Sequence, residues 1–128
     1  LDYPAPSLSA YHPATVVAEK LNAMVLLGVL NSRMKDFYDM HVILRHVPLD
    51  DALLAEAIRA TFERRKVALP RELPVAFTAE FLDDGTKESQ WRAFLRRSAL
   101  TALGLSLAMV LADLRERLWP VLRSIGPS

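Results

Sequence analysis

The sequence predicts a mainly α-helical domain, an antiparallel helical bundle of about five helices with an extended amino-terminal arm. Apolar residues recur at helical spacing in five segments, prolines and capping residues separate those segments, and strand patterns are nearly absent. The chain has 128 residues, of which 52% are hydrophobic and 24% charged, a composition typical of one globular domain with a core. The short connections between segments imply antiparallel neighbours.

The amino-terminal end differs from the rest of the chain. Residues 1–13 hold three of the eight prolines and show no helical period, so we expect an extended arm or interdomain link there. The helical domain is then expected over residues 14–128. The same end has no basic region followed by an apolar run, and it therefore lacks the pattern of a signal peptide.

Five segments combine an apolar helical period with recognisable ends. Prolines, a carboxyl-terminal glycine and Asn, Ser or Asp residues with capping chemistry bound them. The expected helices cover residues 13–30, about 32–47, about 50–66, 87 to about 100, and about 106–125. Pro120 is expected to kink or split the last helix. A few residues around 75–77 give the only strand signal within the helical part.

Charge and composition exclude several classes of function. The 16 basic and 15 acidic residues leave a net charge of +1, so no global field favours nucleic acid or a membrane surface. With no cysteine, the chain has no disulfide framework and no thiolate nucleophile, which favours a reducing compartment, the cytoplasm. The most lipid-like run, residues 99–112, is shorter than the roughly 20 residues of a membrane span. No membrane partner is therefore expected.

Self-contained catalytic motifs are absent from the sequence. There is no glycine-rich phosphate loop, no His pair four residues apart and no serine in a nucleophile elbow. The three histidines, His12, His41 and His46, are spread along the chain, so we expect structural roles for them and no metal site. What remains is Lys20, which interrupts an apolar helical stripe, as lysines do when they are paired or snorkel to the surface.

Two aspartates in the second predicted helix can reach this lysine. Asp36 and Asp39 share a helix face, and Arg33 and Lys35 flank them. In a hairpin that turns near residues 30–32, Asp39 would lie roughly 3 Å and Asp36 roughly 8 Å along the axis from the level of Lys20. On spacing alone, this cation with two carboxylates is either a salt bridge that locks the hairpin or part of a functional site.

Three stretches together resemble one protein family. AEKLNAM carries Lys20, SRMKDFYDM carries basic residues followed by Asp-x-x-Asp, and AIRATFERRKVALP corresponds to the helix that follows them. With these residues the chain resembles the carboxyl-terminal half of the nucleotidyltransferase-like toxins of the AbiEii/AbiGii abortive-infection family. These are bacterial proteins of the type IV toxin–antitoxin class.

The resemblance implies a reaction that this chain does not complete on its own. Family members transfer a nucleotidyl group from a nucleoside triphosphate to an acceptor hydroxyl, with an RNA end as the expected acceptor here. Their amino-terminal half supplies a Gly-Ser loop and an Asp-x-Asp metal pair, and neither motif occurs in these 128 residues. Mg²⁺ and the nucleoside triphosphate are therefore expected to bind productively only together with that half.

The resemblance also implies roles for individual residues. Lys20 matches the lysine that contacts the triphosphate, with Arg33 and Lys35 as further nucleotide-binding residues. Asp36 matches the later essential aspartate, which orients the attacking hydroxyl or takes its proton. Asp39 either shares that catalytic role or only forms a salt bridge. In the salt bridge it would be the closer partner of Lys20 or would hold Arg33 in place.

Two interpretations of function remain open from the sequence. The chain is either the helical half of a nucleotidyltransferase toxin or a stand-alone helical interaction module that binds a partner such as a cognate antitoxin. A generic helical bundle, in contrast, predicts only that Lys20 and Asp36 pair. Two basic segments would hold an RNA backbone if their faces met, although solvated faces are the simpler expectation. Their residues are Arg59, Arg64, Arg65, Lys66 and Arg71, and Lys87, Arg92, Arg96 and Arg97.

Overall fold

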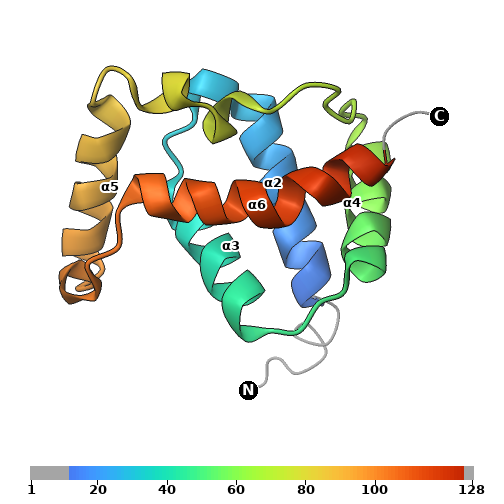
Figure 1. Cartoon of the computed structure of the whole chain (residues 1–128), viewed down its shortest axis with the longest axis horizontal. Helices are drawn as coiled ribbons and strands as arrows, with labels where there is room; N and C mark the ends of the chain where they lie inside the picture. The colour runs from blue at the N-terminus through green and yellow to red at the C-terminus, as the bar shows by residue number, and fades with distance from the viewer. Residues whose placement is uncertain (1–11, 126–128) are drawn as a thin grey trace.

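The computed structural model describes residues 12–125 and contains five α-helices and no strand over that range. The mainly α-helical bundle predicted from the sequence is confirmed (Figure 1). The helices are α2 (Pro13–Leu27), α3 (Met34–His46), α4 (Asp51–Arg65), α5 (Thr86–Arg97) and α6 (Leu107–Ile125). Four short 3-10 helices join them: η1 (Gly28–Leu30), η2 (Val75–Phe77), η3 (Ala79–Leu82) and η4 (Thr101–Leu103).

The expected amino-terminal arm falls almost entirely on residues 1–11, which lie outside the described residues. Pro13, at which the expected arm ends and the first helix was expected to begin, is the first residue of α2. His12 precedes it as the N-cap, where its Nδ1 accepts a hydrogen bond of 3.0 Å from the backbone N–H of Ala14.

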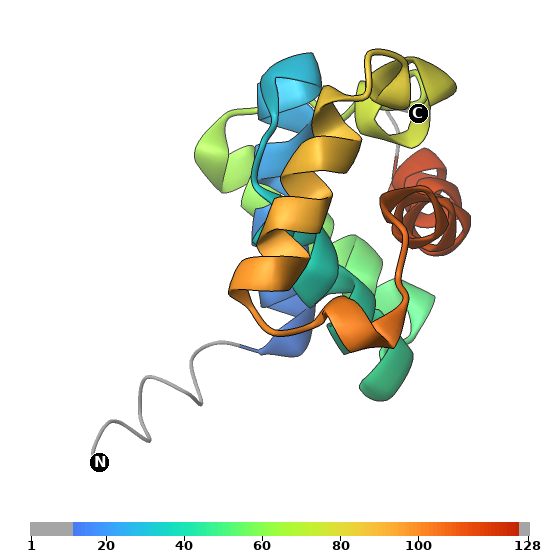
Figure 2. The same cartoon turned by 90° about the vertical axis from the view of Figure 1, so that its left-hand side faces the viewer.

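Three helices alternate in direction and a fourth crosses them. Figure 1 shows α2 and α4 running the same way, with α3 returning in the opposite direction and α6 lying across all three. α2 makes its most extensive contacts with α4, and α6 contacts both α3 and α4. Figure 2 shows α5 facing the viewer, with α6 seen end-on to its right.

One hydrophobic core joins these helices. From α2 it receives Val17, Leu21 and Met24, all at most 1% exposed, which is the stripe expected from helical spacing. Trp91 of α5 is also buried, and its Nε1 donates a hydrogen bond of 3.0 Å to the carbonyl oxygen of Leu105. Along α6 the buried residues recur every three or four positions: Leu107, Val110, Leu111, Leu114, Leu118, Val121 and Leu122.

Several helix ends differ from the sequence prediction. The first helix ends at Leu27, three residues early, because Gly28 has φ +56° and residues 28–30 form a 3-10 turn. The third helix begins as expected, since Asp50 Oδ1 accepts a hydrogen bond of 2.8 Å from Leu53 N–H. Pro120 lies inside α6 without splitting it.

The weak strand signal around residues 75–77 was wrong. These residues form η2, a single 3-10 turn in which Phe77 N–H donates to Pro74 O at 2.9 Å and Thr78 N–H to Val75 O at 2.9 Å. Because these backbone groups bond within the turn, they are not available to pair with a neighbouring strand.

One segment of the described chain, Pro13–Leu30, is long and apolar enough to cross a membrane by length and composition alone. It is not the run at residues 99–112 that the sequence analysis singled out. The segment includes α2, whose buried residues pack in the core, and it carries the charged pair Glu19 and Lys20 near its middle. A core helix passes the same length and composition test, so this finding is weak evidence for a membrane span.

A backbone feature at the end of α5 gives the first prediction. Ala99 is exposed and has φ +57°, a left-handed conformation that costs an L-residue roughly 1–2 kcal/mol. We expect Ala99→Gly to raise the free energy of unfolding by about 0.5–1 kcal/mol in urea titrations followed by circular dichroism. The matched control, Ala93→Gly in the middle of α5, should lower it by about 1 kcal/mol. Equal destabilisation by both substitutions would contradict the left-handed conformation at Ala99.

Candidate functional site

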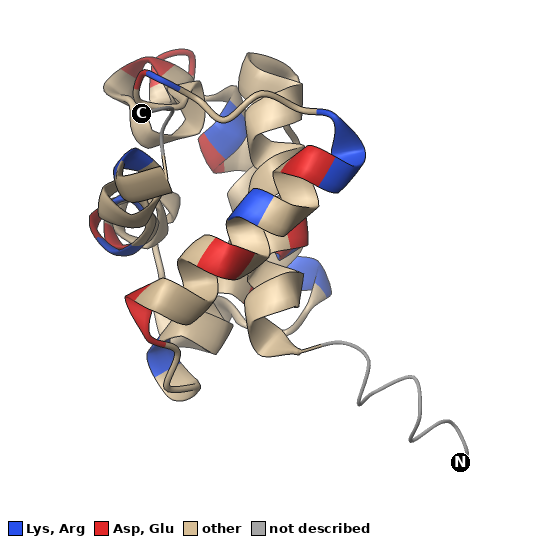
Figure 3. Ribbon diagram, turned by 90° about the vertical axis from the view of Figure 1, so that its right-hand side faces the viewer, with Lys and Arg blue, Asp and Glu red and all other residues tan. Residues whose placement is uncertain are grey.

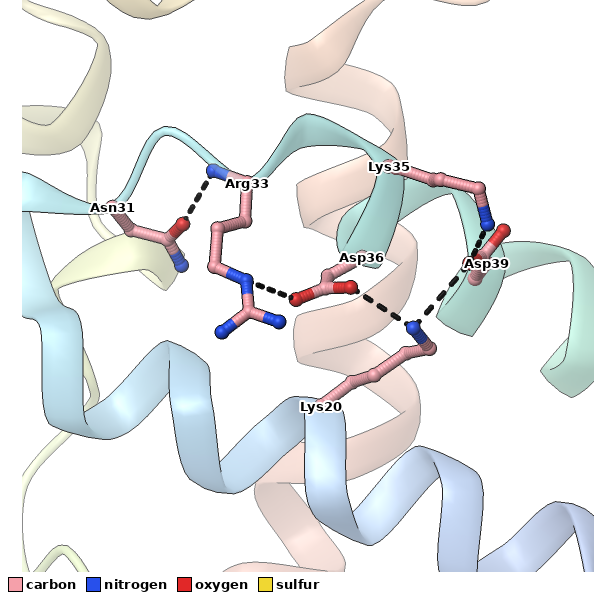
Figure 4. Close-up of polar contacts among 6 residues, drawn as sticks. All are labelled: Lys20, Asn31, Arg33, Lys35, Asp36 and Asp39. Atoms are coloured by element: carbon pink, nitrogen blue, oxygen red, sulfur yellow. Dashed lines mark hydrogen bonds and ion pairs between the residues drawn. The ribbon is translucent and has the colours of Figure 1, made fainter. Parts of the chain in front are cut away.

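The candidate site lies between α2 and the beginning of α3. Lys20 projects from the middle of α2, while Asp36 and Asp39 project from one face of α3 (Figure 4). Arg33 and Lys35 flank the aspartates. The structure thus brings together all five site residues predicted from the sequence.

Lys20 is bound by both aspartates. Its Nζ donates a hydrogen bond of 2.9 Å to Asp36 Oδ1 and lies 3.4 Å from Asp39 Oδ2. The expectation that Asp39 would be the closer partner was therefore wrong. The prediction from the sequence used the helical rise of about 1.5 Å for every residue of the hairpin. The link after η1 is extended instead, and an extended residue covers about twice that length. The longer link places Asp36, and not Asp39, next to Lys20.

The pKa of Lys20 reflects this environment. Partial burial would lower the pKa, but the hydrogen bond to Asp36 and the charges of Asp36 and Asp39 outweigh that effect, so the pKa is raised above its usual 10.5. The ammonium is consequently a fixed positive charge at neutral pH.

Asp36 is the most buried charged group of the cluster, with a side chain only 12% exposed. Arg33 Nε lies 2.8 Å from its Oδ2, so Arg33 pairs with Asp36, not with Asp39. The Arg33 N–H does not point at this oxygen, and Asp36 Oδ2 accepts no hydrogen bond from the described residues. This buried oxygen is therefore held by the charge of Arg33 and not by an aligned hydrogen bond.

The outer edge of the cluster consists of Lys35 and Asp39. Lys35 Nζ donates a hydrogen bond of 2.7 Å to Asp39 Oδ2, and its side chain is 74% exposed. Asp39 therefore sits between an exposed and a half-buried ammonium. An exposed pair four residues apart on a helix contributes only about 0.3–0.5 kcal/mol, so Lys35 is a weak anchor.

A groove of about 750 Å³ opens beside the cluster between α2 and α4. Lys20 and Arg33 line it, whereas Lys35, Asp36 and Asp39 do not. The other polar residues of its lining are Thr15, Glu19, Asn22, Arg64 and Arg65. The cationic members of the cluster thus face a space large enough for a small ligand.

Sequence reasoning missed the residue that holds the loop before α3. Lys87 of α5 is 7% exposed, and its Nζ donates a hydrogen bond of 2.7 Å to the carbonyl oxygen of Asn31 and lies 4.9 Å from the centre of the Phe81 ring. The side-chain oxygen Oδ1 of Asn31 accepts a hydrogen bond of 2.8 Å from the backbone N–H of Arg33. A signal existed in the sequence, because Lys87 shares a helical stripe with Trp91 and Phe94.

The two basic segments do not form one surface. The end of α4, with Arg64 and Arg65, and helix α5 lie at opposite ends of the molecule (Figure 1). Figure 3 shows the basic end of α4 beside acidic residues. Lys87, moreover, is buried and is not part of an exposed basic face. The alternative in which the two basic faces meet on an RNA backbone is therefore not supported.

The histidines occupy separate positions in the fold. His41 is buried, with Nε2 3.2 Å from Asp113 Oδ2, whereas His12 caps α2. Across residues 12–125, no three His, Cys, Asp or Glu side chains gather in a way that could hold a metal ion.

Comparison with known proteins identifies the family. The family model described as nucleotidyl transferase AbiEii toxin, type IV TA system, matches residues 1–110 of the 128. The chain belongs to the AbiEii family. No curated protein and no solved structure matches the chain. The AbiEii match covers the whole cluster around Lys20 and the groove beside it.

Lys87 gives a testable prediction about how the site is held. We expect Lys87→Met to lower the free energy of unfolding by about 1–3 kcal/mol, because it leaves the buried Asn31 carbonyl without its partner. Arg92→Met is the matched control, since Arg92 lies on the same helix, is exposed and pairs only loosely with Glu88 at 3.7 Å. If chemical denaturation gave both variants wild-type stability, Lys87 would not anchor the loop.

The raised pKa of Lys20 gives a third prediction. A raised lysine pKa stabilises the folded state at every pH below the usual 10.5, and this stabilisation is lost as pH rises through the folded-state pKa. The cost of Lys20→Met, about 1–3 kcal/mol, should therefore be constant from about pH 7 to about pH 9 and shrink only above about pH 10.5. Urea titrations across this range, with Lys35→Met as control, would measure it. A cost that shrank already near neutral pH would show that the ammonium is not held by the aspartates.

Proposed function

We propose that this AbiEii chain supplies the nucleotide contacts of a nucleotidyltransferase. In the proposed reaction a nucleotidyl group passes from a nucleoside triphosphate to an acceptor hydroxyl at an RNA end. The observation that carries the proposal is Lys20, whose ammonium is charged at neutral pH and lines a ligand-sized groove in the stretch that resembles the family's triphosphate-binding helix.

Lys20 would bind the triphosphate as a compact point charge. An ammonium on a four-carbon stem can turn from one anion to another without rebuilding a planar contact, which suits a triphosphate that arrives and leaves. Arg33, whose side chain is 57% exposed and lines the same groove, would add a planar contact to phosphate oxygens. Lys35 does not line the groove and would contribute only by holding Asp39.

Asp36 would act on the acceptor hydroxyl. Its Oδ2 accepts no hydrogen bond among the described residues and is held only by the ion pair with the exposed Arg33, so an O–H donor would reach its lone pairs once Arg33 turned to a phosphate. The Oδ1 atom holds Lys20 at the same time, which would place the hydroxyl next to the triphosphate. Asp39, which holds Lys20 and Lys35, would be the secondary catalytic candidate.

The described residues do not fit a Mg²⁺ site. Asp36 and Asp39 are both engaged by ammonium groups, and no third acidic or histidine side chain within residues 12–125 joins them. The Asp-x-Asp metal pair and the Gly-Ser loop of the family would come from an amino-terminal half, so we propose that residues 12–125 do not complete the reaction alone.

A second candidate function is partner binding without catalysis. Three large apolar residues are exposed together where α2 passes into η1: Leu26 is 67%, Val29 56% and Leu30 82% exposed. Exposed apolar clusters of this kind occur at protein-protein contacts, and a cognate antitoxin is the partner that the type IV class suggests. In this reading the contact between Lys20 and Asp36 is only the salt bridge that locks the hairpin.

Nucleotide binding separates the two functions. In isothermal titration with nucleoside triphosphates and Mg²⁺, we expect Lys20→Met to weaken binding by about 10- to 100-fold, the loss typical of one charge-assisted contact. Lys35→Met, which removes the same charge from the same cluster outside the groove, should change the Kd by less than about threefold. Asp36→Asn should retain nucleotide binding.

The outcome that would overturn the proposed function is specific. If the folded wild-type chain bound no nucleotide, or if Lys20→Met and Lys35→Met bound it equally well, the partner-binding function would be favoured. Circular dichroism of each variant would show that the helices persist.

A further inference from the structure

A second charged cluster lies in the same groove, on the side of α4. Arg64 Nη2 contacts Glu19 Oε2, and both Nε and Nη2 of Arg65 lie 2.8 Å from Glu19 Oε1. Two guanidinium groups thus converge on the two oxygens of a single carboxylate. One carboxylate cannot neutralise both, so the cluster keeps an excess positive charge.

This arrangement resembles the way arginines hold a phosphate. Guanidinium groups present their N–H donors in a planar fork that matches the oxygens of a carboxylate or a phosphate. The two arginine side chains are 57% and 56% exposed, whereas Glu19 is 29% exposed, so the arginines can be reached from solvent. A phosphate carries more oxygens and more charge than the Glu19 carboxylate and could engage both forks at once.

A buried donor without a partner lies in the same lining. Asn22 is 3% exposed, and its Nδ2 has no hydrogen-bond partner among the described residues. An unpaired buried N–H donor is unfavourable, and such groups in folded proteins usually meet a water molecule or a ligand acceptor. Because Asn22 lines the groove together with Arg64 and Arg65, the unmet donor points to an acceptor-bearing ligand there.

The rest of the groove suits a phosphate ester. Its cationic lining residues are Lys20, Arg33, Arg64 and Arg65, and its only acidic one is Glu19. Asp36 and Asp39 are the ion partners of Lys20 and Arg33, so the excess positive charge of the groove is concentrated at Arg64 and Arg65. The remaining surface is apolar, with Val16, Ala23, Leu26 and Val67, and could accept a sugar or a base.

We propose that Arg64 and Arg65, with Asn22, form a second phosphate site in this groove, and that Glu19 occupies it as an internal competitor when no ligand is bound. The ligand class rests on the proposed function: the phosphate belongs either to the triphosphate of the nucleotide or to a phosphodiester of the acceptor strand. Either ligand must displace the Glu19 carboxylate, so Glu19 lowers the affinity of the site.

Removing the competitor and removing the site should have opposite effects. The probes are inorganic tripolyphosphate and a single-stranded oligoribonucleotide without terminal phosphates, titrated into the 128-residue chain at low salt. Glu19→Gln should tighten binding of at least one probe by about three- to tenfold, and the double variant Arg64→Gln/Arg65→Gln should weaken the same probe by about tenfold or more. The salt dependence of that probe should also become shallower in the double variant.

Arg59→Gln is the matched control. Arg59 is an exposed arginine of the same helix, forms no ion pair with the described residues and does not line the groove. Its substitution should change either Kd by less than about twofold. A response to tripolyphosphate would assign the site to the triphosphate, and a response to the oligonucleotide would assign it to the acceptor strand.

The inference is overturned if the folded wild-type chain binds neither probe, or if Glu19→Gln and the double variant leave both Kd values within twofold of wild type. The cluster would then be a structural salt bridge between α2 and α4. Adding Lys20→Met separates this failure from that of the proposed function. If only Lys20→Met weakens nucleotide binding, the proposed function stands and the second phosphate site does not exist. If only the Glu19 and arginine variants change binding, the second phosphate site stands and Lys20 has no role in binding the nucleotide.

Discussion

The ion pair between Lys20 and Asp36 is the constraint on which the arrangement of the site depends. Asp36 is nearly buried, so its charge requires a partner, and the ammonium that supplies it comes from a different helix. The pair therefore fixes α3 against α2 at one register. Arg33 pairs with the other carboxylate oxygen of Asp36, and Lys20 and Arg33 both line the groove. The preceding residue of α2, Glu19, reaches Arg64 and Arg65 of α4, so this one helix positions both charged clusters.

Much of the fold could be predicted because the segments have strong helical periods. The stripe of α2 that contains Val17, Leu21 and Met24 is buried as the spacing required, and Asp50 caps α4. The errors lie where local backbone geometry overrides the period. Gly28 adopts a positive φ that no pattern specifies, and it ends α2 early. The turn at residues 75–77 satisfies its own backbone groups, which a propensity for strand does not reveal.

The members of the site could be predicted, but their pairing could not. Helical spacing was sufficient to place Asp36 and Asp39 on one face within reach of Lys20. Which aspartate lies closer depends on the extended link before α3, whose length along the axis is not encoded in the helical period. The contacts of Lys87, Glu19 and the α4 arginines depend on how distant helices pack, and no short-range pattern determines those partners. The burial of Lys87 is the exception that spacing could have indicated.

The hydrogen bond from Lys87 to Asn31 also bears on when the site is assembled during synthesis. The two residues are 56 positions apart, so the loop that carries Arg33 has no partner for its buried carbonyl until α5 has emerged and docked. Chains fold progressively as they leave the ribosome, and non-local contacts form only after both segments are available. A nascent chain that ends before α5 can form the hairpin of α2 and α3 but cannot yet fix the loop between them. The order of translation thus delays the mature site until most of the domain has been made.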